Sequence, residues 1–342
     1  MLCCFSKLNN LKRSFTGFVS LAIAMLIALA CSHRFNMVNN LETVHKKTFK
    51  IAVISDLNSS YGSISYSAEV SAVIKELALI NPDIILCGGD MVAGQKASLT
   101  EQNIKDMWQG FNQTVLKPVQ QLNIPFGFTL GNHDASPTYH TDRSLAKQFW
   151  VDNVEATNLH FIDSSHYPFY FSYTQNNVFF ISWDAAGSKI PGEVYDWMKI
   201  QLRSKTAKIA GLRILLGHLP LYPIVEHKNK PGEVNANPDS ALSFFKDHEI
   251  DLYISGHQHA FYPAQKEGVR LLNAGCIGEG ERKIMGHTDT AKKAYTIIEI
   301  PVQSPKQFSY STYVPVTNQL IDQQTLPDSV VGFSSVLRRE DL

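Results

Sequence analysis

The 342-residue sequence lacks a net charge, a paired-cysteine motif and any internal repeat. Lys and Arg together number 31, as do Asp and Glu, so no overall field draws the chain to nucleic acid or to an anionic membrane surface. Its five cysteines include no Cys-x-x-Cys pair, which argues against a zinc site built from thiolates. A hydrophobic share of 44% and a charged share of 18% are typical of a globular protein and argue against extensive disorder.

Residues 1–30 predict a secretory signal peptide. A basic segment precedes an uncharged and mostly apolar run over residues 14–31. Ala28-Leu29-Ala30 fits cleavage by ordinary signal peptidase, whereas Cys31 directly after it resembles a bacterial lipoprotein junction. An uncleaved membrane anchor is the third alternative, although the run is short for a full span. All three alternatives predict an exported protein, periplasmic or extracellular. The second would attach it to a membrane through a lipidated Cys31, and the third through the apolar segment.

The rest of the chain divides into a polar tether, a folded domain and a tail. Residues 31–48 are polar and unpatterned, and we expect them to be the tether. Residues 49–315 carry strand and helix patterns throughout and are predicted to form one domain. Residues 316–342 lack clear periodicity and are predicted to be a C-terminal tail.

The first half of the domain alternates strands with helices. Strand-like runs at 49–55, 83–87 and 124–130 are separated by helix-like runs at 68–80 and 100–122. Such alternation predicts a parallel sheet with crossover helices.

The second half is richer in strands. Short aromatic strands around an Asn176-Asn177 turn indicate an antiparallel hairpin, and a helix is expected at 191–202. Further strands are expected at 213–216, 252–255, 269–273, 294–300 and 308–314. The prediction is an α/β fold in which two mixed β-sheets pack as a β-sandwich with helices outside.

Polar residues follow five of these strands directly. The five blocks are Ser55-Asp56-Leu57-Asn58, Gly88-Gly89-Asp90, Gly131-Asn132-His133-Asp134, Gly217-His218 and Gly256-His257-Gln258-His259. Carboxylates suit hard divalent ions and imidazole suits Mn, Fe, Co or Zn. One block alone is more often a turn than a ligand set, but five in order at strand ends indicate a two-metal centre. Alternate histidines point to opposite faces of a strand, so His257 and His259 can share a site only if a turn carries them.

At these residues the chain resembles the calcineurin-like metallophosphoesterase superfamily. The family pattern is Asp-x-His, Gly-Asp, Gly-Asn-His-Asp/Glu, His and Gly-His-x-His, and the resemblance spans roughly residues 49–300. It implies a two-sheet sandwich flanked by helices. It also implies that residues 49–315 are a catalytic domain that hydrolyses a phosphomonoester or phosphodiester. A hydroxide bridging two divalent ions (Mn, Fe or Zn) would be the nucleophile.

The resemblance also implies a role for each residue. A first metal would bind Asp56, Asp90 and His259, and a second would bind Asp90, Asn132, His218 and His257. Asn58 is a further candidate ligand of the first metal. His133 would donate to the phosphate or protonate the leaving group, and Asp134 would orient His133.

Asn58 departs from the family pattern, which has His at this position. Purple acid phosphatases also lack that His but supply a Tyr three residues after the bridging Asp, where this chain has Ala93. An amide oxygen is a weaker ligand than imidazole, so we expect the first metal to bind more weakly than the second and to favour Mn or Fe over Zn. The departure leaves an alternative open: a surface-attached module that binds metal or phosphoester with weak or no catalysis.

We expect the partner to be a small-molecule phosphoester. No Lys/Arg cluster lies near any block, which argues against nucleic acid as a substrate. Loops 59–66, 136–143 and 220–237 are expected to shape the pocket. Arg282 and the glycine-rich loop at 273–278 are candidate phosphate contacts.

Overall fold

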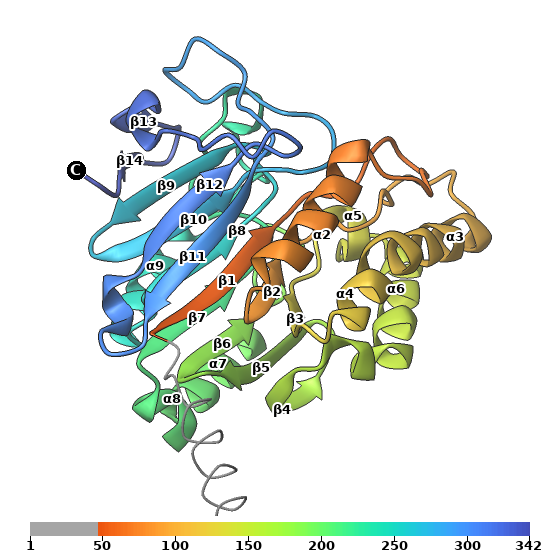
Figure 1. The fold of residues 1–342 in the computed structure, drawn as a ribbon, viewed down its shortest axis with the longest axis horizontal. Coiled ribbons are helices and arrows are strands. Elements are labelled where there is room, and N and C mark those ends of the chain that lie inside the picture. Colours follow the sequence, from red (N-terminus) through yellow and green to blue (C-terminus); the bar gives the residue numbers. More distant parts are fainter. Residues whose placement is uncertain (1–46) are drawn as a thin grey trace, which may run out of the picture. The chain divides into compact units, whose positions relative to one another are not determined.

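The computed structural model describes residues 47–342, so the predicted signal peptide and nearly all of the tether lie outside the described residues. Within that part of the chain, two mixed sheets pack face to face and helices cover their outer sides (Figure 1). The predicted fold class is therefore confirmed.

The smaller sheet has five strands in the order β12-β11-β1-β2-β3 within residues 47–342. Strands β1 to β3 run parallel, and β11 pairs antiparallel with β1. The strands are β1 (Thr48–Ile54), β2 (Ile84–Cys87), β3 (Phe126–Phe128), β11 (Tyr295–Pro301) and β12 (Ser309–Tyr313). The first three match the predicted strands to within two residues at each end, because each is mostly apolar and largely buried, as expected for strands covered on both faces.

The larger sheet has nine strands in the order β13-β14-β9-β10-β8-β7-β6-β5-β4 within the described part. Its members are β4 (His160–His166), β5 (Tyr170–Gln175), β6 (Val178–Ser182), β7 (Leu212–Leu216), β8 (Leu252–Ser255), β9 (Phe261–Lys266), β10 (Val269–Ala274), β13 (Ser329–Val331) and β14 (Val336–Arg339). The predicted hairpin is present as β5 and β6. Its two turn residues, Asn176 and Asn177, both have positive φ, as a tight hairpin turn requires.

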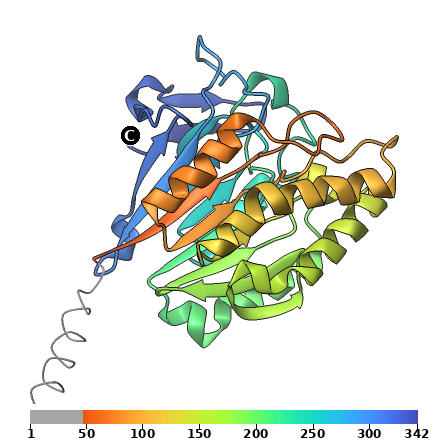
Figure 2. The ribbon, with the colours of Figure 1, turned by 45° about the vertical axis from the view of Figure 1, so that its right-hand side comes forward.

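Helices cover both sheets. Figures 1 and 2 show α2 lying along β1 and β2 in both views. Helices α7 and α9 pack against the outer face of the nine-stranded sheet. The helices are α2 (Ala68–Ile80), α3 (Glu101–Phe111), α4 (Lys117–Gln121), α5 (Asn132–Ala135), α6 (His140–Asp152), α7 (Gly192–Arg203), α8 (Lys205–Ile209) and α9 (Pro238–Asp247). A π-helical turn, η1 (Asn112–Leu116), joins α3 to α4, so the single helix predicted over 100–122 is present in three pieces.

Alternate residues of the central strands serve two cores. In β6, Val178 and Phe180 lie between the sheets, while Phe179 and Ile181 pack beneath the outer helices. This period of two is the geometry of a strand buried on both faces. The central strands are thereby packed on both faces, and this packing positions the loops that leave the strand ends.

The prediction that residues 316–342 form a tail outside the domain is wrong, because these residues are part of the folded unit. Strand β14 pairs with β9, and β13 pairs with β14. Val330 and Leu337 are buried in the outer core. The segment has no clear periodicity because each strand is short and buries only one apolar side chain. Between residues 47 and 342, no helix combines the length and apolarity needed to cross a bilayer.

Candidate metal centre

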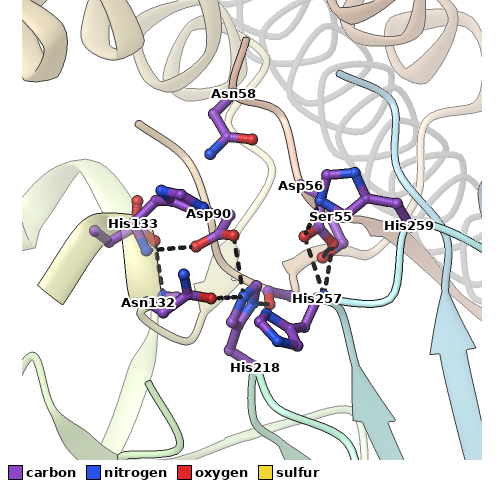
Figure 3. Close-up of polar contacts among 12 residues, drawn as sticks. Ser55, Asp56, Asn58, Asp90, Asn132, His133, His218, His257 and His259 are labelled. Carbon is purple, nitrogen blue, oxygen red and sulfur yellow. Dashed lines mark hydrogen bonds and ion pairs between the residues drawn. The ribbon is translucent and has the colours of Figure 1, made fainter. Parts of the chain in front are cut away.

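The five polar blocks converge at one place where the two sheets meet. Asp56, Asp90 and Asn132 follow the parallel strands β1, β2 and β3, and His218, His257 and His259 follow β7 and β8. Carboxyl ends of parallel strands share an edge, which brings residues more than 200 positions apart in sequence within contact. Figure 3 shows Asp56 and His259 on one side of the centre and Asp90, Asn132 and His218 on the other.

The first group of ligand atoms belongs to Asp56, Asp90 and His259, which lie within 4.8 Å of one another. His259 Nε2 is 3.1 Å from Asp56 Oδ1, and its Nδ1 is 2.9 Å from the carbonyl oxygen of Gly280. That carbonyl accepts from Nδ1, which leaves Nε2 as the nitrogen with a free lone pair facing the carboxylate. Both Asp56 oxygens also accept from the backbone N–H of His257, at 3.0 Å each.

The second group contains Asp90, His218 and His257, again within 4.8 Å of one another. His218 Nδ1 is 2.7 Å from the carbonyl oxygen of Gly88, so its Nε2 faces inward, 3.1 Å from Asp90 Oδ2 and 3.1 Å from Asn132 Oδ1. Asn132 Nδ2 donates to Gln95 Oε1 at 2.7 Å, which settles the orientation of the amide and turns its oxygen to the centre. Asp90 belongs to both groups.

The backbone at the centre is held in a conformation that L-residues rarely adopt. Asp56, Asp90, His257 and His259 all have φ between +50° and +68°. Each such residue is less stable by about 1–3 kcal/mol than in an ordinary region, a strain that the surrounding structure must offset. The turn predicted for His257 and His259 is present: both residues have positive φ, and each offers a ring nitrogen to one of the two groups that share Asp90.

Two glycines allow the loops to approach the carboxylates. A Cβ on Gly131 would lie 2.8 Å from Cγ of Asp90, closer than carbon atoms pack. A Cβ on Gly278 would lie 2.6 Å from the backbone of Asp56 and Leu57. The N–H of Gly278 instead donates to the Asp56 carbonyl oxygen at 2.9 Å. The glycine-rich loop expected to contact phosphate therefore supports the backbone of the first block.

The electrostatics of the centre favour added positive charge. Asp56 and Asp90 are 0% and 1% exposed, although buried carboxylates are stable only when paired. Burial opposes the imidazolium form, but the Asp90 carboxylate outweighs it and raises the pKa of His218 to about 9. Burial and the Lys228 ammonium lower the pKa of His257 to about 3, which keeps that ring in the neutral form that binds metals.

The residues therefore fit two divalent cations. Two imidazole Nε2 atoms are directed inward by carbonyls on their other nitrogen, an amide oxygen is turned inward, and a carboxylate is shared between two groups. Mixed N and O donors suit Mn, Fe, Co or Zn. Asp56, Asp90 and His259 would hold one ion, and Asp90, Asn132, His218 and His257 the other.

Asn58 lies near the first group. It is 7% exposed, and its Nδ2 donates to the carbonyl oxygen of Val92 at 3.2 Å. Because the amide nitrogen is engaged there, Oδ1 is the atom available for a cation. Figure 3 shows Asn58 above the gap between Asp90 and the pair formed by Asp56 and His259.

His133 borders the centre, but Asp134 does not orient it. The backbone N–H of His133 donates to Asp90 Oδ1 at 2.9 Å, and its Nδ1 is 3.2 Å from the carbonyl oxygen of Gly94. The Asp134 carboxylate is fully buried and accepts from two backbone N–H groups, Val92 at 2.9 Å and Gly131 at 2.8 Å. Its predicted role is corrected: Asp134 caps the N-terminus of α5 and holds the loop after β2, and Gly94 is the group that orients the imidazole.

A cavity of about 570 Å³ opens beside the centre. All three loops expected to shape the pocket contribute to its wall, with Tyr61, Ser136 and Lys228 as examples. Arg282 also lines the cavity, as expected for a phosphate contact, and its Nη1 donates to the His257 carbonyl oxygen at 2.8 Å.

Sequence reasoning missed Lys228 and Glu233. Lys228 is 8% exposed and its Nζ lies 2.9 Å from His257 Nε2. Glu233 Oε2 lies 2.8 Å from the same Nε2. Neither belongs to a short motif, and the one signal was their place in the loop at 220–237.

Comparison with known proteins gives both a family and a fold. The family model of calcineurin-like phosphoesterases matches residues 49–261. No curated protein matches the chain by sequence. A purple acid phosphatase from yellow lupin (Lupinus luteus) seeds is similar in structure, with a TM-score of 0.61 and 13% identity over 80% of this chain and 53% of that one. This chain thus spans about half the length of the lupin protein.

A second similar structure is GAP50, described as the anchor in the inner membrane complex of Plasmodium. It has a TM-score of 0.55 and 16% identity, covering 82% of this chain and 92% of that one. At such identities the likeness concerns the fold alone.

Proposed function

Because the chain belongs to the calcineurin-like phosphoesterase family, we propose that it is a metal-dependent hydrolase of a small-molecule phosphomonoester or phosphodiester. The observation that carries the proposal is the position of Asp90. Its carboxylate is common to two groups of ligand atoms, each within 4.8 Å, which is the arrangement needed to hold two cations side by side.

Two divalent ions bound there would supply an activated water as the nucleophile and neutralise charge on the phosphoryl oxygens. The protein's own groups position these elements. Asp90 is held by the His133 backbone N–H, and Asp56 by the backbone N–H of His257 and the hydroxyl of Ser55. These bonds keep both carboxylates aimed at the centre before substrate arrives.

His133 is the group proposed to assist the leaving group. Its Nδ1 donates to Gly94, and the ring lines the cavity. Tyr61 packs beside it, with ring centroids 5.2 Å apart. Nε2 is then the nitrogen available to donate a proton to a departing alkoxide, a contribution of about 10²–10⁴-fold in rate.

Turnover of a chromogenic aryl phosphate and a bis-aryl phosphate, with Mn, Fe, Co or Zn, tests the proposal. The Asp90→Ala variant should lose all measurable turnover, since both metal sites lose a ligand. His133→Ala should keep its metals and lose kcat by about 10²–10⁴-fold. An Asp90→Ala variant with near-normal turnover would refute the shared role of Asp90.

Asn58 favours one alternative, a module that binds metal or phosphoester with little or no catalysis. Its amide replaces the imidazole of the family pattern, and the Val92 carbonyl engages its nitrogen. This alternative predicts metal binding with little or no turnover of either substrate by any of the four metals. Efficient turnover with any of them rejects it.

We also propose that the protein is exported, on the basis of its N-terminal sequence. Cell fractionation tests this proposal, and mass spectrometry of the mature N-terminus separates a lipidated Cys31 from simple cleavage after Ala30.

A further inference from the structure

We propose that Lys228 and Arg282 form a cationic wall that selects phosphomonoesters over phosphodiesters. The inference deepens the proposed function and rests on it. The wall flanks His257, so it stands beside the position of the reacting phosphoryl group.

The Lys228 ammonium is largely buried, and a buried cation is stable only when it has a partner. It lies at the end of the short helix η3 (Glu226–Lys228), with its side chain 11% exposed. Nζ is 2.9 Å from His257 Nε2 and 3.2 Å from Glu233 Oε2. Glu233 is shared with His257 and, at 3.9 Å, with Lys230. Lys228, Lys230 and His257 share the single carboxylate of Glu233. Glu233 therefore does not neutralise all of the positive charge at the cavity wall.

Arg282 adds a second cation on the same wall. Its Nη1 donates to the His257 carbonyl oxygen at 2.8 Å, which fixes the guanidinium against the cavity. Within the described part of the chain it makes no salt bridge. Its remaining N–H groups are therefore available to an anion.

The charges lining the cavity have one dominant sign. Lys189, Lys228 and Arg282 line it, and Glu233 is the one carboxylate that does so among residues 47–342. An anion entering between Lys228 and Arg282 would relieve their mutual repulsion and gain charge-assisted hydrogen bonds from both.

A phosphomonoester has the charge and the terminal oxygens to pair with this cationic wall, and a phosphodiester does not. The monoester has three terminal oxygens and a charge of about −1.5 to −2 near pH 7. Two oxygens can face the metal centre, and the third is then free to pair with the wall. A diester has one charge and two terminal oxygens, so it would place an uncharged organic group against Lys228 and Arg282.

The test compares kcat/KM for an aryl phosphate and a bis-aryl phosphate in the metal-loaded protein. Lys228→Met should lower kcat/KM for the monoester by about 10- to 100-fold, the loss expected for a hydrogen bond between charged groups. The diester should change by less than about 3-fold. Arg282→Met is the second variant and should shift the ratio in the same direction. Lys230→Met is the matched control, because Lys230 also pairs with Glu233 but is 58% exposed and does not line the cavity.

Binding of inorganic phosphate, measured by calorimetry, provides a readout that does not need turnover. Lys228→Met should weaken it by about 10- to 100-fold with metal content unchanged. If the natural protein turned over neither ester, the proposed function would fail, and this measurement would still test the wall. Equal losses on both esters, loss of metal in Lys228→Met, or unchanged phosphate affinity would each overturn the selective role of Lys228.

Discussion

Replacing Gly131 by Ala tests how tightly the centre is built around Asp90. The added Cβ would lie 2.8 Å from Asp90 Cγ, whereas carbon atoms pack at about 3.5–4.0 Å. The same Cβ would also overlap Asp90 Oδ1 and the Asp90 backbone nitrogen, so the Asp90 side chain must move by about 1 Å and the backbone beside it must shift as well. The backbone at Gly131, with φ −90° and ψ 176°, suits alanine, so the contact with Asp90 is the change under test.

A shift of about 1 Å exceeds the tolerance of about 0.2 Å for a metal ligand. We therefore expect Gly131→Ala to lose at least one of two bound ions and about 10²-fold in kcat/KM. Overpacking should cost about 1–3 kcal/mol of stability, which leaves the protein folded.

Three measurements on the same preparation check this prediction: metal content after dialysis, kcat/KM for an aryl phosphate, and urea unfolding. Gly192→Ala is the matched control, because a Cβ there would meet no atom within 4 Å. Two retained ions together with kcat/KM within about 3-fold of the natural protein would refute the placement of Asp90 between the two sites.

Three other substitutions have outcomes that the structure predicts. Asn58→His should tighten the first site by about tenfold or more and shift it towards Zn, as a metal titration would show; two equally tight Zn ions in the natural protein would contradict the premise. Glu233→Gln should weaken the second site by about 10- to 100-fold, because His257 loses a carboxylate partner; an unchanged Kd would exclude that role. Burial, opposed by Arg270, raises the pKa of Glu340 from 4.5 to about 7, so the unfolded state ionises first and stability falls between about pH 4.5 and 7. Urea unfolding at pH 4.5 and 7.5 should show that Glu340→Gln removes up to about 3 kcal/mol of this loss in the free energy of unfolding. The same loss in both proteins would contradict the prediction.

The elements nearest the centre could be predicted because their sequence patterns are strong. Helix α2 has the predicted bounds, Ala68–Ile80, and buries Val70, Val73, Ile74 and Leu77 at helical spacing. Strand β2 is a continuous apolar run, and β1 ends in the buried apolar residues 51–54. In these elements local pattern and tertiary burial agree.

Other elements lack such patterns. Helix α6 is mostly polar and buries few side chains, among them Ala146 and Trp150. Strand β9 contains Pro263, which argues against a strand when only the sequence is read. It exists because β10 and β14 flank it, which is tertiary information.

The site divides in the same way. The ligand residues lie in short motifs directly after strands, so their convergence could be expected from the sequence. Lys228 and Glu233 reach His257 from a loop 24–29 positions away whose path depends on the whole fold. Asp134 follows His133 in the chain, but the turn of α5 directs its carboxylate to the backbone of Gly131 and Val92.

Anomalous diffraction from crystals grown with Mn²⁺ tests the central claim most directly. We predict two manganese peaks about 3.5–4 Å apart, with one oxygen of Asp90 bound to each or one shared between them. A single peak, or two peaks of which only one contacts Asp90, would contradict the account.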